Sequence, residues 1–269
     1  MPVPWFVLTN GLVADNEQAQ EEFMRESTVW YGLDHPNIVK MYGGCHVGDP
    51  VFFVCEHVKG GNFVTLFEKD KSQLWRLFYS AALGLRYLHE NKVVHGDLKC
   101  NNILVDGNTA KIYDFGFSYV RERSDMSLQA QTKQIRWKAP EAIMPLDQNL
   151  NPRFASDVFS FGMCIIEAFL EGEPPYGLDD DEVVIEKILD GEKYPRADGI
   201  QDDEWAFVLR LCEHNWEARL TIDDALRTLK MFADREAAGS QPLECSKCTI
   251  TLPAEAVACW KCASLMKDN

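Results

Sequence analysis

The sequence lacks any excess of positive charge and any apolar segment long enough to cross a bilayer. Its 27 Lys and Arg residues stand against 42 Asp and Glu residues, which gives 269 residues a formal net charge of −15. Nucleic acid and anionic membranes bind to clusters of Lys and Arg that displace counterions, so we expect neither as a partner. The most apolar stretch, residues 158–170, contains Glu167 and is shorter than the about 20 residues that a membrane span requires.

A secretory signal is also missing from the start of the sequence. Residues 1–8 contain neither a basic leader nor an apolar segment of about 7–15 residues. Five cysteines are scattered at irregular spacing before residue 213, which indicates buried thiols in a reducing compartment. With 46% hydrophobic and 11% aromatic residues, the composition is that of a globular protein, and we expect a cytoplasmic location.

Hydrophobic periodicity predicts a small mixed α/β region followed by a mainly helical one. An amphipathic helix is expected over residues 17–33, and strands are expected over 38–42 and 51–55. The spacing of apolar residues predicts a long helix with one buried face over 74–88. Further helices are expected over residues 157–169, 182–189, 204–212 and 221–235. A turn-rich linker is expected over residues 237–243.

Two short runs, residues 103–105 and 110–113, flank an Asp-Gly turn and predict a β-hairpin. Asn102 directly precedes the first strand and Asp114 directly follows the second, so we expect their side-chain oxygens to meet at one end of the hairpin. Proteins typically hold Mg²⁺ through one or two such oxygens together with substrate phosphates. Asp97 lies five residues before Asn102, and we expect its carboxylate in the same place.

Several motifs, in this order, resemble those of the protein kinase family. They are His95-Gly96-Asp97-Leu98-Lys99-Cys100-Asn101-Asn102, Asp114-Phe115-Gly116 and Ala139-Pro140-Glu141. Residues 157–162 resemble the central helix of that family and residues 216–219 its late Arg motif, so the resemblance extends from 21 to 235. It implies an α+β, bilobal kinase-like fold with a truncated small lobe over residues 1–58 and a mainly helical large lobe over 59–236.

The resemblance also implies roles for four residues of the large lobe. Asp97 is expected to accept the proton of the substrate hydroxyl, and Lys99 to lie near the transferred phosphoryl group. Asn102 and Asp114 are expected to hold Mg²⁺. The expected ligands are therefore ATP and Mg²⁺, with a protein substrate or signalling partner. Lys99 is the Ser/Thr-kinase choice, and residues 134–138 resemble the tyrosine-kinase-like branch, so protein Ser/Thr is the favoured acceptor.

In the small lobe the resemblance implies a nucleotide site. Glu26 precedes His35 by nine residues, as does the helix Glu that pairs with the nucleotide lysine in the family. Cys55, Glu56 and Val58 belong to a stretch that resembles the hinge, whose backbone groups meet the adenine. Cys55 is then the small residue at the rear of the pocket.

The sequence lacks two elements of the family pattern that should precede Glu26. Residues 1–39 contain no Gly-x-Gly-x-x-Gly loop and no lysine, and Arg25 is the only basic residue there. Gly96 stands where the family commonly has the Arg that grips a phosphorylated activation segment, so activation by loop phosphorylation is not expected. Three interpretations stay open: a shortened version of an active kinase, a pseudokinase scaffold, and an enzyme with an unusual phosphate anchor.

The last 25 residues contain a separate cysteine pattern, Cys245-x2-Cys248-x10-Cys259-x2-Cys262. Two such thiolate pairs complete a tetrahedral Zn²⁺ site with no open position, which indicates a structural metal. A segment this short cannot build a core of its own, so the metal would supply the folding free energy. The pattern resembles a zinc ribbon over residues 244–269. A disulfide pair and a redox Cys-x-x-Cys are the alternatives.

Overall fold

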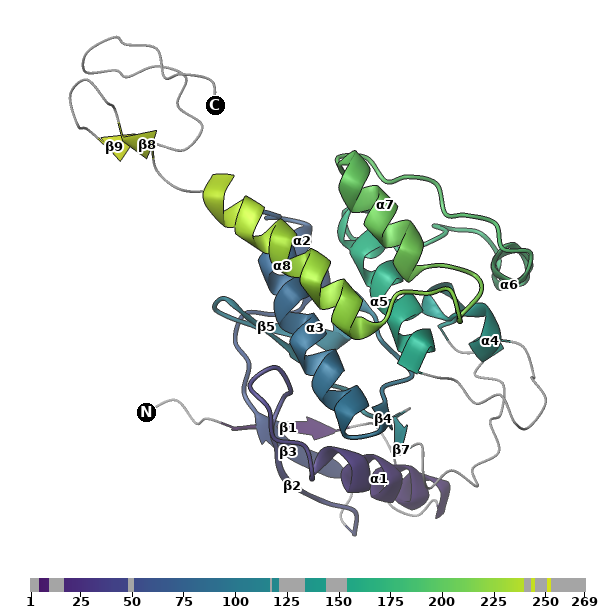
Figure 1. Ribbon diagram of the computed structural model, residues 1–269. Coiled ribbons are helices and arrows are strands. Elements are labelled where there is room, and N and C mark those ends of the chain that lie inside the picture. Colours follow the sequence, from purple (N-terminus) through teal and green to yellow (C-terminus); the bar gives the residue numbers. More distant parts are fainter. Residues whose placement is uncertain are drawn as a thin grey trace.

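The computed structural model describes residues 5–9, 17–47, 51–116, 118–120, 134–143, 154–239, 243–244 and 251–252. In these residues a small lobe, made of a three-stranded sheet and one helix, lies against a larger and mainly helical lobe (Figure 1). None of the described helices has both the length and the apolar character needed to cross a membrane.

The small lobe contains an antiparallel sheet with the strand order β1-β3-β2. Its strands are β1 (Trp5–Thr9), β2 (Met41–Cys45) and β3 (Phe52–Glu56), and α1 (Glu17–Trp30) packs against them. Phe23 of α1 stacks on Phe53 of β3 with ring centroids 4.5 Å apart. Trp30 is 1% exposed, and its Nε1 donates to Val39 O at 2.6 Å. These aromatic contacts fix the helix on the sheet.

The large lobe is built around α5, a helix that is buried from Ser156 to Ala168. The helix α3 lies beside α8 (Figure 1). Phe78 of α3 meets Phe161 of α5 edge to face, with ring centroids 5.6 Å apart. The elements are α2 (Phe63–Phe67), α3 (Leu74–Glu90), β4 (Val93–Val94), η1 (Cys100–Asn102), β5 (Ile103–Asp106), β6 (Thr109–Ile112), β7 (Tyr119–Val120), η3 (Ile135–Trp137), α4 (Pro140–Ile143), α5 (Phe154–Ala168), α6 (Asp181–Leu189), α7 (Asp202–Leu211) and α8 (Ile222–Gly239).

The hairpin predicted after residue 102 is confirmed. Strands β5 and β6 pair antiparallel, with Ile103 opposite Ile112 and Asp106 opposite Thr109. The two-residue loop contains Gly107 at φ 59°, a left-handed conformation that glycine adopts without steric cost.

The junction between the lobes differs from the expected strand over 38–42. Ile38 forms only an isolated bridge with Ile112, and the strand β2 begins at Met41. The reason is Asn37, whose Nδ2 donates to Ser80 Oγ at 2.7 Å and to Ala110 O at 2.9 Å. Its carbonyl oxygen accepts from Ile112 N at 2.9 Å. These bonds attach residues 37–39 to the large lobe before β2 begins.

The last helix runs to Gly239, so the first three residues of the predicted linker are helical. Beyond the end of α8, the short strands β8 (Leu243–Glu244) and β9 (Thr251–Leu252) pair antiparallel (Figure 1). The four cysteines of the predicted zinc ribbon lie outside the described residues. The ribbon therefore stays a prediction.

Candidate active site

Three of the predicted site residues come together around Asp97, in the loop between β4 and η1. The side chain of Asp97 is 4% exposed. Asn102 Nδ2 donates to Asp97 O at 2.9 Å and to Asp97 Oδ2 at 3.2 Å. Lys99 Nζ lies 3.2 Å from the same Oδ2. The carboxylate is thus held by an amide and an ammonium group from its own loop.

Asp157, near the start of α5, fixes the loop that carries Asp97. Its carboxylate accepts from His95 N and Gly96 N, each at 2.9 Å, and lies 3.0 Å from His89 Nε2. Burial disfavours the charged form of Asp157, but the hydrogen bonds from His89 and Gly96 N and the nearby imidazoles of His89 and His95 outweigh this, and the pKa of Asp157 is lowered. A charged carboxylate therefore orients the backbone directly before Asp97.

His95 links this loop to the strand that leads to Asp114. Asp97 N donates to His95 Nδ1 at 3.2 Å, so the proton of a neutral ring lies on Nε2. That nitrogen is 3.1 Å from Tyr113 O, which accepts the bond. The imidazole therefore connects the residue after β6 with the loop of Asp97.

Asn102 and Asp114 lie at the same end of the hairpin. Tyr113 N donates to Asn102 O at 3.1 Å, and Asp114 is the next residue, with a left-handed φ of 68°. Since the amide nitrogen of Asn102 is used by Asp97, its side-chain oxygen is the atom left for a cation. An amide oxygen and a carboxylate fit the oxygen preference of Mg²⁺.

The small lobe approaches this end of the hairpin through α1. A Cβ atom placed on Gly116 would lie 3.6 Å from Glu26 Oε2 and 3.5 Å from Asp114 Oδ1. Both carboxylates therefore face Gly116. Arg25 Nη2 donates to Gly116 O at 2.9 Å, and Arg25 Nε is buried without a hydrogen-bond partner among the described residues.

The predicted hinge residues lie at the C-terminal end of β3, with Cys55 and Glu56 inside the strand and Val58 just after it. Cys55 is 3% exposed, and burial raises the pKa of its thiol to about 11, so the neutral form is kept. The carboxylate of Glu56 is 2.9 Å from Lys111 Nζ of β6. Val58 is half-buried and packs on the core. The carboxylate of Glu56 is therefore engaged by Lys111 of β6.

Sequence reasoning named residues 134–138 but assigned no role to Lys138. Its side chain is 4% exposed, and Lys138 Nζ lies 3.3 Å from Asp97 Oδ1 and donates to Gly96 O. Gln134 Oε1 accepts from Lys99 Nζ. The position of Lys138 directly before the apolar Ala139 could have suggested that it is buried, but its partner Asp97 lies 41 residues away along the chain. No local pattern predicts that contact.

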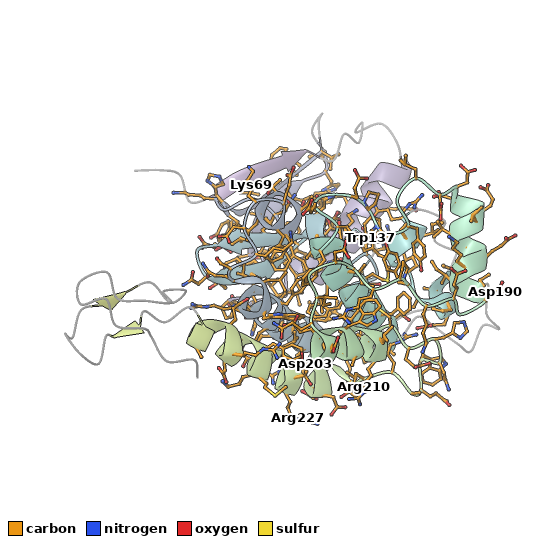
Figure 2. The ribbon with its side chains drawn as sticks, turned by 90° about the horizontal axis from the view of Figure 1, so that it is seen from above. Lys69, Trp137, Asp190, Asp203, Arg210 and Arg227 are labelled. Carbon is orange, nitrogen blue, oxygen red and sulfur yellow. The ribbon has the colours of Figure 1, made fainter. Side chains whose placement is uncertain are left out.

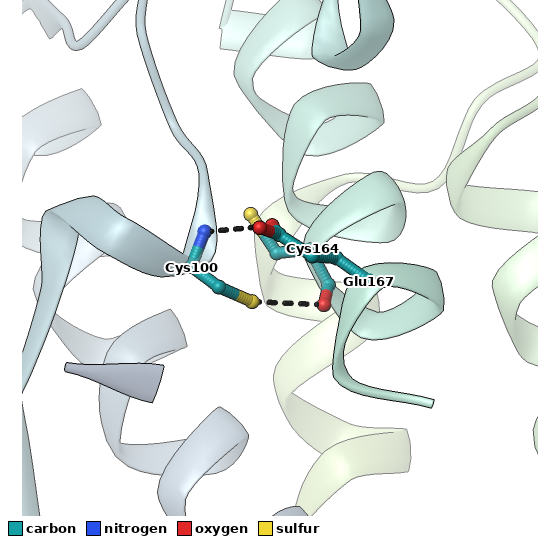
Figure 3. A group of neighbouring side chains, drawn as sticks. All are labelled: Cys100, Cys164 and Glu167. Carbon is teal, nitrogen blue, oxygen red and sulfur yellow. Dashed lines mark hydrogen bonds between the residues drawn. The ribbon is translucent and has the colours of Figure 1, made fainter. Parts of the chain in front are cut away.

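Trp137 is partly buried against the core of the large lobe (Figure 2) and contacts a cluster of possible metal ligands, Cys100, Cys164 and Glu167 (Figure 3). Glu167 Oε2 accepts from Trp137 Nε1 at 2.8 Å and from Cys100 N at 2.9 Å. Cys100 Sγ donates to Cys164 O at 3.2 Å.

This cluster is better explained as a structural support than as a metal site. Burial raises the pKa of both thiols and of Glu167, which favours their neutral forms, whereas metal binding requires thiolates. The hydrogen bonds of Glu167 instead connect Cys100 of η1 with Trp137 of η3.

Glu141 and Arg219 form a buried ion pair in the large lobe. Arg219 Nη1 donates to Glu141 Oε1 at 2.7 Å, and Nη2 to Glu141 Oε2 at 3.2 Å. Ser156 Oγ donates to the same carboxylate at 2.7 Å. Burial alone would raise the pKa of Glu141, but the bonds from Arg219 and Ser156 lower it. The pair fastens α4 to the loop before α8.

Comparison with known proteins gives matches over the same region. The family model described as protein tyrosine and serine/threonine kinase matches residues 11–229. The tyrosine-protein kinase SRK3 of Spongilla lacustris is 30% identical over 230 residues, which cover 82% of this chain and 67% of that protein.

Two further relatives come from an animal and a moss. The tyrosine-protein kinase Fer of Mus musculus is 31% identical over 226 residues, which cover 80% of this chain. The mitogen-activated protein kinase kinase kinase 1a of Physcomitrium patens is 31% identical over 215 residues, which cover 77% of it. In each of these two proteins the match covers 27% of the relative's own length.

Proposed function

Because the chain belongs to the protein kinase family, we propose that it transfers a phosphoryl group from Mg²⁺-bound ATP to a hydroxyl group of a protein. The observation that carries this proposal is the arrangement of Asp97, whose carboxylate is held by Lys99 and Asn102. Phosphoryl transfer needs little covalent help from the protein and depends on positioning and charge neutralisation. These three residues supply both.

Each residue has a definite part in the proposed reaction. Asp97 accepts the proton of the acceptor hydroxyl, and the amide of Asn102 keeps the Asp97 carboxylate in place. Lys99 places positive charge beside the transferred group. Asn102 and Asp114 would hold Mg²⁺, which neutralises phosphate charge when it is bound. Asp157 fixes the backbone just before Asp97 by accepting hydrogen bonds from His95 N and Gly96 N.

Protein Ser/Thr is the proposed acceptor, although two of the relatives above are named tyrosine kinases. Lys99 supports this choice by resemblance to Ser/Thr kinases. Gln134 stands where Ser/Thr members of the tyrosine-kinase-like branch usually have a hydroxyl residue, and its Oε1 still gives Lys99 an oxygen acceptor. Phosphoamino acid analysis of a phosphorylated protein mixture decides the point, and phosphotyrosine as the main product contradicts it.

A pseudokinase scaffold is the second candidate, and it is favoured by a specific observation. Residues 1–39 contain no lysine that could pair with Glu26, and their one basic residue, Arg25, donates to Gly116 O. Without the nucleotide lysine of the family, rates would fall by about 10²–10³. In that case the helical lobe would serve to bind other proteins.

The test of the proposed activity uses the full chain and the variant Asp97→Asn. We expect Mg·ATP to raise the melting temperature of the wild-type protein, and Asp97→Asn to lower phosphate transfer by about 100- to 10,000-fold because the base is lost. Asp106→Asn, an exposed position in β5, is the matched control and should keep full activity. No turnover by the wild type, with or without nucleotide binding, supports the scaffold instead.

For the C-terminal segment we propose a structural zinc ribbon. The antiparallel pairing of β8 with β9 supports it, because Cys245 and Cys248 lie between these strands in the sequence, as a metal knuckle requires. Metal analysis of the purified chain should find about one zinc, which a chelator removes with exposure of four thiols. A metal-free segment containing disulfides contradicts the ribbon.

A further inference from the structure

Lys138 is a buried cation whose carboxylate partner is the catalytic Asp97. Its side chain is 4% exposed, its Nζ lies 3.3 Å from Asp97 Oδ1, and it also donates to Gly96 O. Burying an ammonium group is unfavourable unless the charge is paired and hydrogen-bonded. Burial lowers the pKa of Lys138, and the Asp97 charge opposes this effect. The side chain is therefore placed here by its bonds to the catalytic loop.

The donors around Asp97 come from two different segments. Asp97 Oδ2 accepts hydrogen bonds from Lys99 Nζ and Asn102 Nδ2, each at 3.2 Å, and both residues closely follow Asp97 in the sequence. Asp97 Oδ1 accepts a hydrogen bond from Nζ of Lys138, the residue directly after η3. Contacts on both oxygens fix the plane of a carboxylate, whereas contacts on one oxygen leave it free to rotate. The orientation of Asp97 thus depends on residues 134–138 being docked on the catalytic loop.

Residues 135–137 have anchors that do not involve Lys138. Trp137 Nε1 donates to Glu167 Oε2 at 2.8 Å, and Ile135 is buried against residues of α6. Arg136 donates to the carbonyl oxygens of Pro175 and Asp179. Removal of the Lys138 ammonium group should therefore leave the segment in place while it frees Asp97 Oδ1.

We propose that Lys138 is a positioning residue, which holds Asp97 Oδ1 and so orients the carboxylate toward the acceptor hydroxyl. The inference rests on the proposed phosphoryl transfer, in which Asp97 is the base. The Arg that commonly grips a phosphorylated segment is replaced by Gly96, whose carbonyl oxygen accepts from the same ammonium group. Lys138 therefore joins the end of this segment to the catalytic loop with a charge that the chain itself supplies.

The experiment compares Lys138→Met, Lys138→Arg and Arg136→Met in the full chain, with kcat and both KM values measured for each. We expect Lys138→Met to lower kcat by about 10- to 100-fold while the KM for ATP changes less than about twofold. Lys138→Arg should recover most of the rate, because a guanidinium can donate to the same oxygen. Arg136→Met is the matched control: it removes a cation of the same segment that does not touch Asp97, and its kcat should stay within about threefold of the wild type.

Three outcomes of these assays overturn the proposal. An unchanged kcat in Lys138→Met means that Asp97 needs no second ammonium group. An increased kcat means that Lys138 blocks the base. Equal losses in Lys138→Met and Arg136→Met mean that docking of the segment, and not the contact with Asp97, sets the rate.

A thermal-unfolding cycle separates this proposal from the proposed function. If the wild type shows no turnover, the proposed function fails, and the cycle of Lys138→Met and Asp97→Asn still tests the contact. Each single change removes the contact between Lys138 and Asp97, so the double variant should lose less melting temperature than the sum of the two single losses. Additive losses overturn the contact itself.

Discussion

Two arginines, one in each lobe, show how differently the lobes satisfy their buried charges. Arg219 of the large lobe donates to both oxygens of Glu141 and to the carbonyl oxygens of Glu213, Ala155 and His214. Arg25 of the small lobe donates only to Gly116 O in the described part of the chain, and its buried Nε has no partner there. Among the described residues, Arg219 thus belongs to a network of hydrogen bonds and an ion pair, while Arg25 has a single hydrogen bond.

The largest effect on stability is expected for Arg219→Met. This change leaves Glu141 buried with an uncompensated charge, which is destabilising by about 3–5 kcal/mol. Arg227→Met is the control, since Arg227 lies on the outer side of α8 (Figure 2) and its ion pair with Asp224 is exposed. That variant should stay within about 0.5 kcal/mol of the wild type in urea unfolding. Similar losses in both variants would remove the distinction between buried and exposed pairs.

A second effect concerns the pH dependence of stability, which should have opposite signs for different carboxyl groups of the large lobe. Glu141 and Asp157 have lowered pKa values in the folded state, so their stabilisation is fully present above the unfolded values of about 4.3 and 3.9. It is lost as the pH falls through their folded pKa. Glu167 has a raised pKa, so its contribution is present at low pH and is lost as the pH rises through the folded value.

Unfolding free energies measured between pH 7 and pH 3 test these signs. We expect the wild type to lose stability below about pH 4.5, and Glu141→Gln to show a shallower loss because one of the two carboxyls is removed. The stability of Glu167→Gln relative to the wild type should increase as the pH rises, because the amide does not ionise. A steeper acid loss in Glu141→Gln would contradict the assigned direction.

The smallest effect is expected for Arg25→Met in the small lobe. One hydrogen bond to Gly116 O is lost, which is worth about 1 kcal/mol, and an unpartnered buried nitrogen is removed at the same time. The melting temperature should therefore change little, as in the control Arg76→Met at an exposed site of α3. A loss as large as that of Arg219→Met would show that Arg25 has a charged partner beyond the described residues.

Local patterns predicted the parts of the fold in which the decisive contacts are close in sequence. The hairpin of β5 and β6 was predicted with its turn, because Asp106 and Gly107 fix the register within four residues. The helix α3 was predicted over most of its length from its apolar face alone. The same hairpin brought Asn102 and Asp114 to one end, which is why the predicted cation site could be drawn from sequence.

Contacts that join distant segments could not be predicted in this way. The strand β2 starts later than predicted because Asn37 bonds to Ser80 and Ala110, which follow it by 43 and 73 positions in the sequence. Likewise, Lys138 contacts Asp97, and the neighbouring Trp137 donates to Glu167 of α5, but the sequence shows no spacing that relates these four residues. The family resemblance supplied the roles of Asp97 and Lys99, but it did not reveal the second ammonium group.

Asn37 also limits how the two lobes can move. Its side chain bonds to Ser80 and Ala110, its carbonyl oxygen accepts from Ile112 N, and a Cβ on Gly84 would lie only 2.6 Å from that oxygen. No side chain larger than hydrogen fits between α3 and this point, so the chain here cannot slide. Asn37 therefore holds the chain between the two lobes at a fixed position against α3.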